Sequence, residues 1–405
     1  MTVRALDNDR VPVDNGFTIM EMMVATAIMM TVIGAVFSLL NPAQGAFHAQ
    51  PEVSDLQQRM RVGVSVLTQE ILMAGAGTYM GSSPGPLNRY FAPVMPYRIG
   101  GVNNDATAGV FYRTDTLTLM YVPPTPAQTR VNTAASSGRA LEVDARLNCG
   151  SDRHDRLCGF KEGMRVLIYN PSGSWDDVTL TSIQGHALHF QHSGGLSSAY
   201  DRGDAVITEV AAHTFYLKTD LAANTHQLMH YDGASTDLPV VDNVVKLQFS
   251  YYGDPQPPTV IPGKSMLDPI GPWTTYGAKP PAPGVDNASD TWGAGENCTI
   301  RIDHGLQVAR LPVLADSQGP VLLTQAHLTD GPWCPDDAYP NRYDADLLRI
   351  RKVRVTLRVQ AAVASLRGPA GILFAHGGTS SSAERYVPDQ EVRFDVTPRN
   401  MNLGR

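Results

Sequence analysis

The longest apolar run in the sequence lies near its beginning and extends from Phe17 to Leu40. It reads FTIMEMMVATAIMMTVIGAVFSLL, and Glu21 is its only ionisable side chain. At about 1.5 Å per residue, a helix of this length spans roughly 36 Å, which exceeds a hydrocarbon core of about 30 Å. The run therefore predicts a membrane-spanning helix that carries one carboxylate.

A second, amphipathic pattern follows this run. Apolar residues recur at three- and four-residue steps, at Val53, Leu56, Met60, Val64, Leu67 and Ile71. This spacing predicts a helix with one buried face, which Pro51 would begin and 75–77 (GAG) would end. Between the two patterns, Asn41 and Pro42 predict a break that ends or loosens the first helix. We therefore expect a linker and a stem helix over 41–77.

From about Thr116 the period becomes two, which is typical of strands. The predicted strands are Thr116–Val122, Ala140–Val143, Met164–Tyr169, Val178–Ile183, Ala187–Gln191, Ala205–Glu209, His213–Lys218, Gln227–Tyr231 and Val244–Tyr252. Gly, Pro, Asn and Asp punctuate them, and no helical pattern of comparable strength interrupts them. Residues 78–253 are thus expected to form an antiparallel, β-rich head.

Residues 254–345 form a Pro/Gly-rich insertion. Proline and glycine in 254–297 are dense enough to exclude regular structure, which predicts a long surface excursion. Its aromatic residues, Trp273, Tyr276 and Trp292, are expected to pack back onto the head or to contact a neighbouring subunit, and not to form a ligand cage.

The C-terminal segment, 346–405, is expected to complete the head with two strands. The stronger lies in 346–363, where Val353, Val355, Leu357 and Val359 share one face. Upstream apolar positions are out of phase, so the pattern predicts a bulge or a helical turn near Arg351. A last strand is expected at Val392–Val396.

The chain has 405 residues, a net charge of −7 and four cysteines. Of three possible pairings we favour the two that are local in sequence, Cys149 with Cys158 and Cys298 with Cys334. Disulfides would place the head outside the cytoplasm. The alternative is a zinc site, but these spacings lack the tight C-x2–4-C pattern.

The residues before the apolar run identify the kind of membrane segment. The leader MTVRALDNDRVPVDNG is polar and of mixed charge, unlike a secretory signal. Gly16 and Phe17 follow, and Glu21 stands fifth from Phe17. This G-F-T-x-x-E motif resembles the class III leader of type IV prepilins. The resemblance implies that prepilin peptidase removes 1–16, that Phe17 becomes the methylated N-terminus, and that Glu21 contacts that amine in a neighbouring subunit.

Further stretches are similar to PilW-type minor pilins, at 56–77, 237–254, 347–360 and 398–403. The resemblance implies an α+β, type IV pilin-like fold, in which a long N-terminal helix packs on the β-rich head and 17–40 is the assembly helix. It also implies a non-enzymatic filament subunit that primes or caps the pilus. Its partners would be other major and minor pilins and the inner-membrane assembly platform. The protein would lie in the inner membrane before assembly and in the pilus afterwards.

Two other functions remain open. The same N-terminal motif occurs in pseudopilins of type II secretion systems, where the stem drives a short piston. A tip adhesin or ligand-binding pilin, with 254–345 contacting a surface, is the third possibility.

Residues that could carry catalysis are not arranged in a recognisable motif. The sequence has no G-x-S-x-G, Walker or H-E-x-x-H motif, so no enzymatic activity and no cofactor is expected. The glycines at 75, 77 and 81 suggest a phosphate loop but follow a helix instead of a strand.

Three polar clusters in the sequence are candidate binding sites. His186, His189 and His192 alternate across a strand and cannot converge on one metal, so no metal site is expected. Asp152 and Asp155 could bind calcium but lack the D-x-D-x-D-G pattern. The basic stripe Lys352, Arg354 and Arg358 could contact DNA or an acidic neighbour. A solvated strand face is the preferred interpretation, since no aromatic residues interleave, and nucleic acid is not an expected partner.

Overall fold

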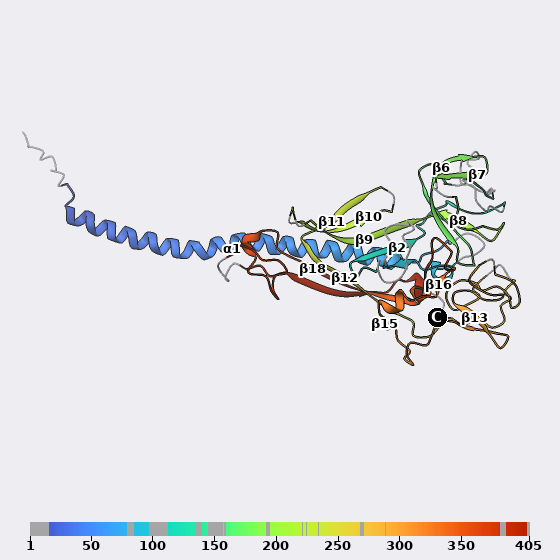
Figure 1. Cartoon of the computed structure of the whole chain (residues 1–405). Coiled ribbons are helices and arrows are strands. Elements are labelled where there is room, and N and C mark those ends of the chain that lie inside the picture. Colours follow the sequence, from blue (N-terminus) through green and yellow to red (C-terminus); the bar gives the residue numbers. More distant parts are fainter. Residues whose placement is uncertain are drawn as a thin grey trace, which may run out of the picture.

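The structure is a computed structural model of the chain, and it combines a long helix with an antiparallel β-rich body (Figure 1). It describes residues 16–78, 85–96, 112–133, 140–144, 157, 159–191, 195–220, 222–223, 225–233, 235–267, 271–287, 289–380 and 386–402, with the backbone alone for 39–48. The helix projects from the body, so the molecule is elongated.

Helix α1 runs without interruption from Ile19 to Met73, over 55 residues. The break predicted at Asn41 and Pro42 is therefore wrong, and Pro51 lies inside the helix instead of beginning it. A proline removes one main-chain hydrogen bond and strains the turn before it, while the flanking turns keep their bonds. In a helix of this length, and with the second half held by the head, that local cost does not end the helix.

The first half of α1 is long and apolar enough to cross a membrane. The segment Ile19–Ser38 meets that criterion, and none of it is buried within the protein. Large apolar side chains such as Met20, Met30 and Phe37 are mostly exposed to the surroundings. This half therefore needs a lipid or protein environment outside the single chain.

The second half of α1 packs its predicted stripe against the sheets. Leu56, Leu67 and Ile71 are fully buried and Met60 nearly so, whereas Val53 and Val64 are half-buried at the edges. Gly63 is also buried, and a Cβ atom there would lie 2.8 Å from Leu357 Cδ2. The stem helix thus approaches the sheet most closely at a residue that lacks a side chain.

Two antiparallel sheets pack against the stem helix. The first has the order β1 (Val94–Met95), β2 (Thr116–Tyr121), β9 (Ala211–Asp220), β10 (Thr225–Tyr231) and β11 (Asp237–Asp242). The second has the order β15 (Val321–Leu323), β12 (Val244–Gly253), β18 (Ile350–Val359) and β19 (Gln390–Val396). Strands β2, β11, β18 and β19 all contact α1, so the stem helix forms part of the main apolar core.

The change of phase predicted near Arg351 is confirmed. A 3-10 helix, η3 (Ala345–Arg349), precedes β18. Tyr252 pairs with Lys352 and Gly253 with Ile350, so the register shifts across Arg351. The bulge turns the odd-numbered valines and Leu357 into the core, where all four predicted positions are fully buried.

A third sheet forms a lobe with its own apolar core. Its order is β3 (Gln128–Arg130), β8 (Val206–Glu209), β5 (Arg165–Tyr169), β6 (Trp175–Gln184), β7 (Ala187–Gln191) and β4 (Ala140–Glu142). It lies at the end of the molecule away from the exposed half of α1 (Figure 1). All nine strands predicted between Thr116 and Tyr252 are present with small shifts of their ends, and together they belong to three sheets.

The insertion combines irregular chain with short hairpins. No strand or helix lies between Gly253 and Ile300 in the described residues. Two hairpins follow, β13 (Ile300–Asp303) with β14 (Leu306–Ala309), and β16 (Trp333–Cys334) with β17 (Tyr343–Asp344). Single 3-10 turns are η1 (Leu87–Arg89), η2 (Ala326–Leu328), η4 (Ala364–Leu366) and η6 (Asn400–Asn402).

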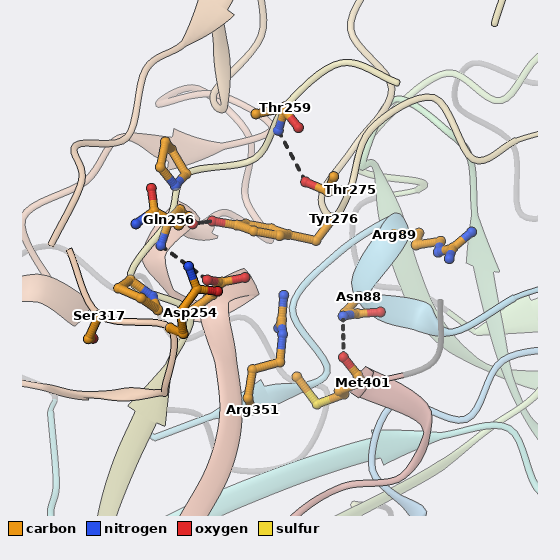
Figure 2. A pocket seen from close by; sticks show the side chains of 13 residues that line it. Asn88, Arg89, Asp254, Gln256, Thr259, Thr275, Tyr276, Ser317, Arg351 and Met401 are labelled. Atoms are coloured by element: carbon orange, nitrogen blue, oxygen red, sulfur yellow. Dashed lines mark hydrogen bonds between the residues drawn. The ribbon is translucent and has the colours of Figure 1, made fainter. Parts of the chain in front are cut away.

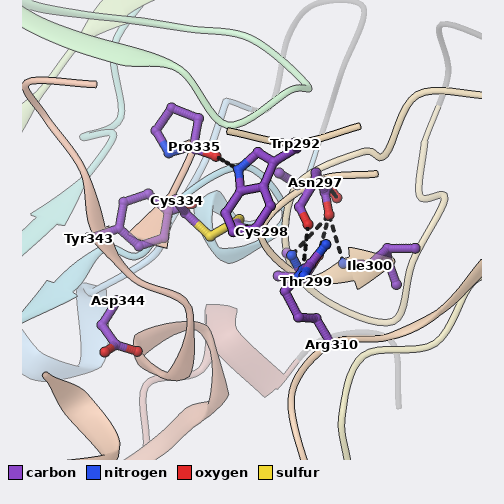
Figure 3. The surroundings of a disulfide bond; sticks show 12 residues. Trp292, Asn297, Cys298, Thr299, Ile300, Arg310, Cys334, Pro335, Tyr343 and Asp344 are labelled. Atoms are coloured by element: carbon purple, nitrogen blue, oxygen red, sulfur yellow. Dashed lines mark hydrogen bonds between the residues drawn. A yellow bond between two sulfur atoms is a disulfide. The ribbon is translucent and has the colours of Figure 1, made fainter. Parts of the chain in front are cut away.

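The insertion packs onto the body, as we predicted from its aromatic residues. Trp273 and Tyr276 are buried and Trp292 is half-buried against the main core. A disulfide between Cys298 and Cys334 is confirmed, with 5.2 Å between the two Cα atoms (Figure 3). Since β15 also belongs to the insertion and pairs with β12, the segment is tied to the head at several points.

Candidate functional site

The residues predicted for leader cleavage precede the first turn of α1. Gly16 has no atom within 4 Å of where a Cβ would stand, and Phe17 is 89% exposed. Both belong to extended chain outside the helix. The Gly16–Phe17 peptide bond is therefore accessible from the surroundings.

Glu21 is held in a capping box with Thr18. Glu21 N donates to Thr18 Oγ1 at 3.2 Å, while Thr18 N and Thr18 Oγ1 both donate to Glu21 Oε2 at 2.9 Å. The box satisfies donors at the helix N-terminus that have no partner within the helix. It also gives the carboxylate partners within its own chain, which lowers the cost of placing it at a membrane. The T-x-x-E spacing is the sequence signal that indicates this box.

A network at the other end of the stem ties α1 to the first sheet. Tyr121 OH donates to Glu70 Oε2 at 3.0 Å, and His213 Nδ1 lies 3.1 Å from the same oxygen. His230 Nε2 lies 3.0 Å from His213 Nδ1. These four side chains come from α1, β2, β9 and β10, and no sequence pattern indicated that they would meet.

Ionisation of this network favours one charge state. Glu70 is part-buried, which opposes its charge, but the hydrogen bonds and positive potential from His213 prevail and lower its pKa. Burial, followed by the neighbouring His213, lowers the pKa of His230. The network is thus arranged for a charged Glu70 beside a neutral His230.

The predicted basic stripe faces acidic partners on β19. Arg354 Nε donates to Asp395 Oδ1 at 2.6 Å, and Lys352 Nζ donates to Asp395 Oδ2 at 3.1 Å. Arg358 Nε donates to Asp389 at 3.0 Å, just before β19. Hydrogen bonds from Arg354 and Lys352 lower the pKa of Asp395 to about 2. The strand pairing therefore provides the acidic neighbour within the chain itself.

The histidines and aspartates considered as metal ligands are only partly within the described residues. His186 is exposed in the turn before β7, and His189 is half-buried within that strand, opposite Ala140. His192, Asp152 and Asp155 lie outside the described residues. The predicted partners Cys149 and Cys158 lie outside them as well.

An acidic group that the sequence did not indicate forms where β17 meets η3. One carboxylate oxygen each from Asp330, Asp344 and Asp346 lies within 4.8 Å of the others. Burial raises the pKa of Asp344 to about 8 and that of Asp346 to about 6. Arg349, fully buried, pairs with Asp346 at 2.5 Å. Burying Asp344 and Asp346 costs folding free energy, and the ion pair with Arg349 partly offsets that cost.

The disulfide joins the irregular part of the insertion to β16 (Figure 3). Trp292 Nε1 donates to Pro335 O at 2.5 Å, and the Arg310 guanidinium lies 4.4 Å from the Trp292 ring centroid. Asn297 Oδ1 accepts from Thr299 N and Ile300 N, both at 2.9 Å. The bond and these contacts, together with main-chain hydrogen bonds such as Gly295 N to Val285 O, fix the 292–300 loop.

Comparison of the chain with protein-family models, with characterised proteins and with solved structures gave no match. The function is therefore inferred from the geometry of the stem helix and the head. Among the described features, the stem helix is the one whose two halves face different environments.

Proposed function

We propose that this protein is a minor type IV pilin of the PilW type, a non-enzymatic filament subunit that primes or caps the pilus. The observation that supports this most strongly is the division of one continuous helix, α1, into an exposed apolar half and a half packed into a β-rich head. A helix of this kind can anchor the subunit in a membrane and later pack against equivalent helices in a fibre.

The N-terminal residues have defined tasks in this proposal. Cleavage after Gly16 leaves Phe17 as a positively charged N-terminus, and Glu21 supplies the carboxylate that binds such an amine in a neighbouring subunit. Both groups stand at the exposed start of α1, where a neighbour can reach them. The apolar side chains of 19–38 then provide the packing surface.

Mass spectrometry of the mature N-terminus tests the proposal. The protein, expressed with a prepilin peptidase, is expected to begin with N-methylated Phe17 and to lack 1–16. A Gly16→Val variant is expected to remain uncut, because the peptidase reads the small residue before the bond. An intact leader in the wild-type protein would contradict the proposal.

A gene deletion separates the pilus from a secretion system. The deletion is expected to reduce surface piliation and to leave exoprotein secretion unchanged. Normal piliation with lost secretion would favour the type II pseudopilin instead. Normal piliation with lost adhesion would favour the tip adhesin.

A further inference from the structure

A pocket of about 430 Å³ opens where the insertion meets the body (Figure 2). Its walls come from six parts of the chain, including η1, the segment after β12 and the bulge of β18. The volume falls in the range of small-molecule sites, roughly 300–1,000 Å³. The filament function proposed above does not use it.

The floor of the pocket is buried and rich in polar groups. Asn88, Asp254, Tyr276 and Arg351 line it, each at most 8% exposed. Figure 2 shows the Arg351 side chain rising into the pocket between Asp254 and Asn88. Burying a polar side chain costs free energy unless the side chain is hydrogen-bonded. We therefore expect contacts within the protein to hold these side chains in place before a ligand binds.

Specific contacts fix two of these floor groups. Arg351 Nη1 donates to Leu348 O at 2.7 Å and to Ile350 O at 2.8 Å, and its guanidinium lies 4.9 Å from the Tyr276 ring centroid. Tyr276 OH donates to Gln256 O at 2.8 Å. The arginine and the ring are therefore rigid elements of the pocket.

Asn88 has bonding capacity to spare. Its Nδ2 donates to Met401 O at 3.4 Å, whereas its buried Oδ1 has no hydrogen-bond partner in the described part of the chain. A buried acceptor of this kind costs stability until a donor reaches it.

The rim of the pocket consists of small polar side chains exposed to solvent. Gln256, Thr259, Thr275 and Ser317 form it. Thr275 Oγ1 accepts from Thr259 N at 3.1 Å, and Gln256 Nε2 donates to Ala315 O at 3.1 Å. The rim thus offers hydroxyl and amide groups on an ordered backbone.

The lining combines donors with acceptors, and it holds two arginines, Arg89 and Arg351, and one carboxylate, Asp254. Arg351 donates, Asp254 accepts, and Asn88 and Gln256 can do both. Apolar surface from Tyr276, Met401, Pro255 and Pro257 lies among them. A simple anion would face the Asp254 carboxylate, and an apolar ligand would bury these polar groups without partners. A ligand that carries many hydroxyls, each both donor and acceptor, on an apolar ring face satisfies the whole lining.

We propose that this pocket binds a neutral saccharide unit. The guanidinium of Arg351 would donate to one hydroxyl, the carboxylate of Asp254 would accept from an adjacent hydroxyl, and the Tyr276 side of the pocket would face the C–H surface of the sugar. The proposal is independent of filament assembly, because the pocket lies in the head and far along the chain from the 19–38 segment.

Binding to a glycan array, followed by saturation-transfer NMR with the neutral methyl glycosides that score, tests this proposal. The full chain is solubilised in a zwitterionic detergent, since glycoside detergents would themselves carry a sugar. Thr259→Trp places an indole over the mouth from an exposed rim position, and Thr291→Trp is the matched control at an exposed site outside the pocket.

At least one neutral saccharide is expected to bind the wild type and Thr291→Trp equally and to lose all detectable binding to Thr259→Trp. Asp254→Asn, which keeps the side-chain volume, is expected to bind at least tenfold more weakly. Failure of every neutral saccharide to bind, binding restricted to charged glycans, or unchanged binding to Thr259→Trp would overturn the proposal. Melting temperatures equal to that of the wild type exclude misfolding as the cause.

Discussion

At the scale of single residues, the side chains with the sharpest roles are carboxylates in demanding places. Glu21 stands at the start of an apolar helix and forms hydrogen bonds with Thr18. Asp344 is fully buried within an acidic group and keeps its proton to about pH 8. One is placed where a partner can reach it, and the other is enclosed by the fold.

Replacing Glu21 tests the assembly contact. Glu21→Ala is expected to reduce incorporation into filaments at least tenfold, because it removes the carboxylate that would bind a neighbour's amine. Cleavage after Gly16 is expected to continue. Quantitative immunoblots of sheared filaments against membrane fractions measure the ratio, and Thr18→Val, which removes only the hydroxyl of the capping box, is the control. Normal incorporation of Glu21→Ala would exclude the assembly role.

The buried Asp344 makes the folded protein sensitive to alkali. Between pH 3.8 and about 8, Asp344 is protonated in the folded protein and ionised in the unfolded chain, so unfolding releases a proton. The free energy of unfolding therefore falls as the pH rises through that window. Asp344→Asn removes the effect. Between pH 5 and 9, its free energy of unfolding relative to wild type is expected to rise by roughly 1–3 kcal/mol. Urea titrations at both pH values measure this, with the exposed Asp337→Asn, which lies outside the acidic group, as control. An unchanged difference would show that Asp344 is not buried and protonated.

At the scale of elements, the junction between α1 and the sheets determines the form of the stem. The buried stripe of the helix meets β18 and β11, and Gly63 lets it come close to Leu357. The network of Glu70 with His213 then links the far end of the helix to the first sheet. Apolar contact and a polar link thus act on the same helix face.

Adding a side chain at Gly63 is expected to separate the helix from the sheet. Gly63→Val would place its Cβ 2.8 Å from Leu357 Cδ2, and overpacking of this kind costs about 1–3 kcal/mol. Ser65→Val adds the same β-branched side chain on the exposed face of the same helix and serves as the control. Thermal unfolding followed by circular dichroism compares the two. Equal melting temperatures would contradict the close approach.

Acid is expected to weaken the link between the stem and the first sheet. The pKa of His230 and that of Glu70 are both lowered by folding, so the folded state binds fewer protons than the unfolded chain. Their contribution is present above pH 6.5 and is lost as the pH falls, first through His230 and then, below 4.5, through Glu70. His230→Gln is expected to flatten the decline in stability from pH 6.5 to 5. A slope identical to that of the wild type in urea titrations would exclude this role.

At the scale of the whole molecule, the chain has four parts. They are the exposed first half of α1, a core built on the second half of α1, a separate β lobe, and an insertion that contains a disulfide. The insertion lies against the body through β15, buried aromatic residues and one disulfide. The pocket lies at this junction, so its shape depends on how the insertion is fixed.

Removal of the disulfide is expected to destabilise the head. Cys298 and Cys334 are 36 residues apart, and closing a loop of that length is worth about 4 kcal/mol in the chain-entropy model. The double variant Cys298→Ser, Cys334→Ser is expected to unfold at lower urea concentration. The wild type under reducing conditions should be destabilised at least as much. A double variant as stable as the oxidised wild type would contradict this contribution.

The sequence alone was sufficient wherever a local pattern determines the outcome. The 24-residue apolar run predicted the exposed helix, period-two patterning predicted the strands, and the phase slip predicted the bulge at Arg351. Pairing of Cys298 with Cys334 was also predicted, because the two cysteines are local in the sequence. Each of these depends on neighbours in the chain.

Only the tertiary structure decided what depends on residues far apart in the sequence. Pro42 suggested a break by local propensity, yet the helix is continuous. The acidic partners of the basic stripe come from β19 and the residues before it. Glu70 meets His213 from β9, which meets His230 from β10, and the pocket is assembled from six parts of the chain. Local pattern carries the preference of each segment, but packing and strand order determine which side chains meet, because those contacts join segments whose spacing along the chain is arbitrary.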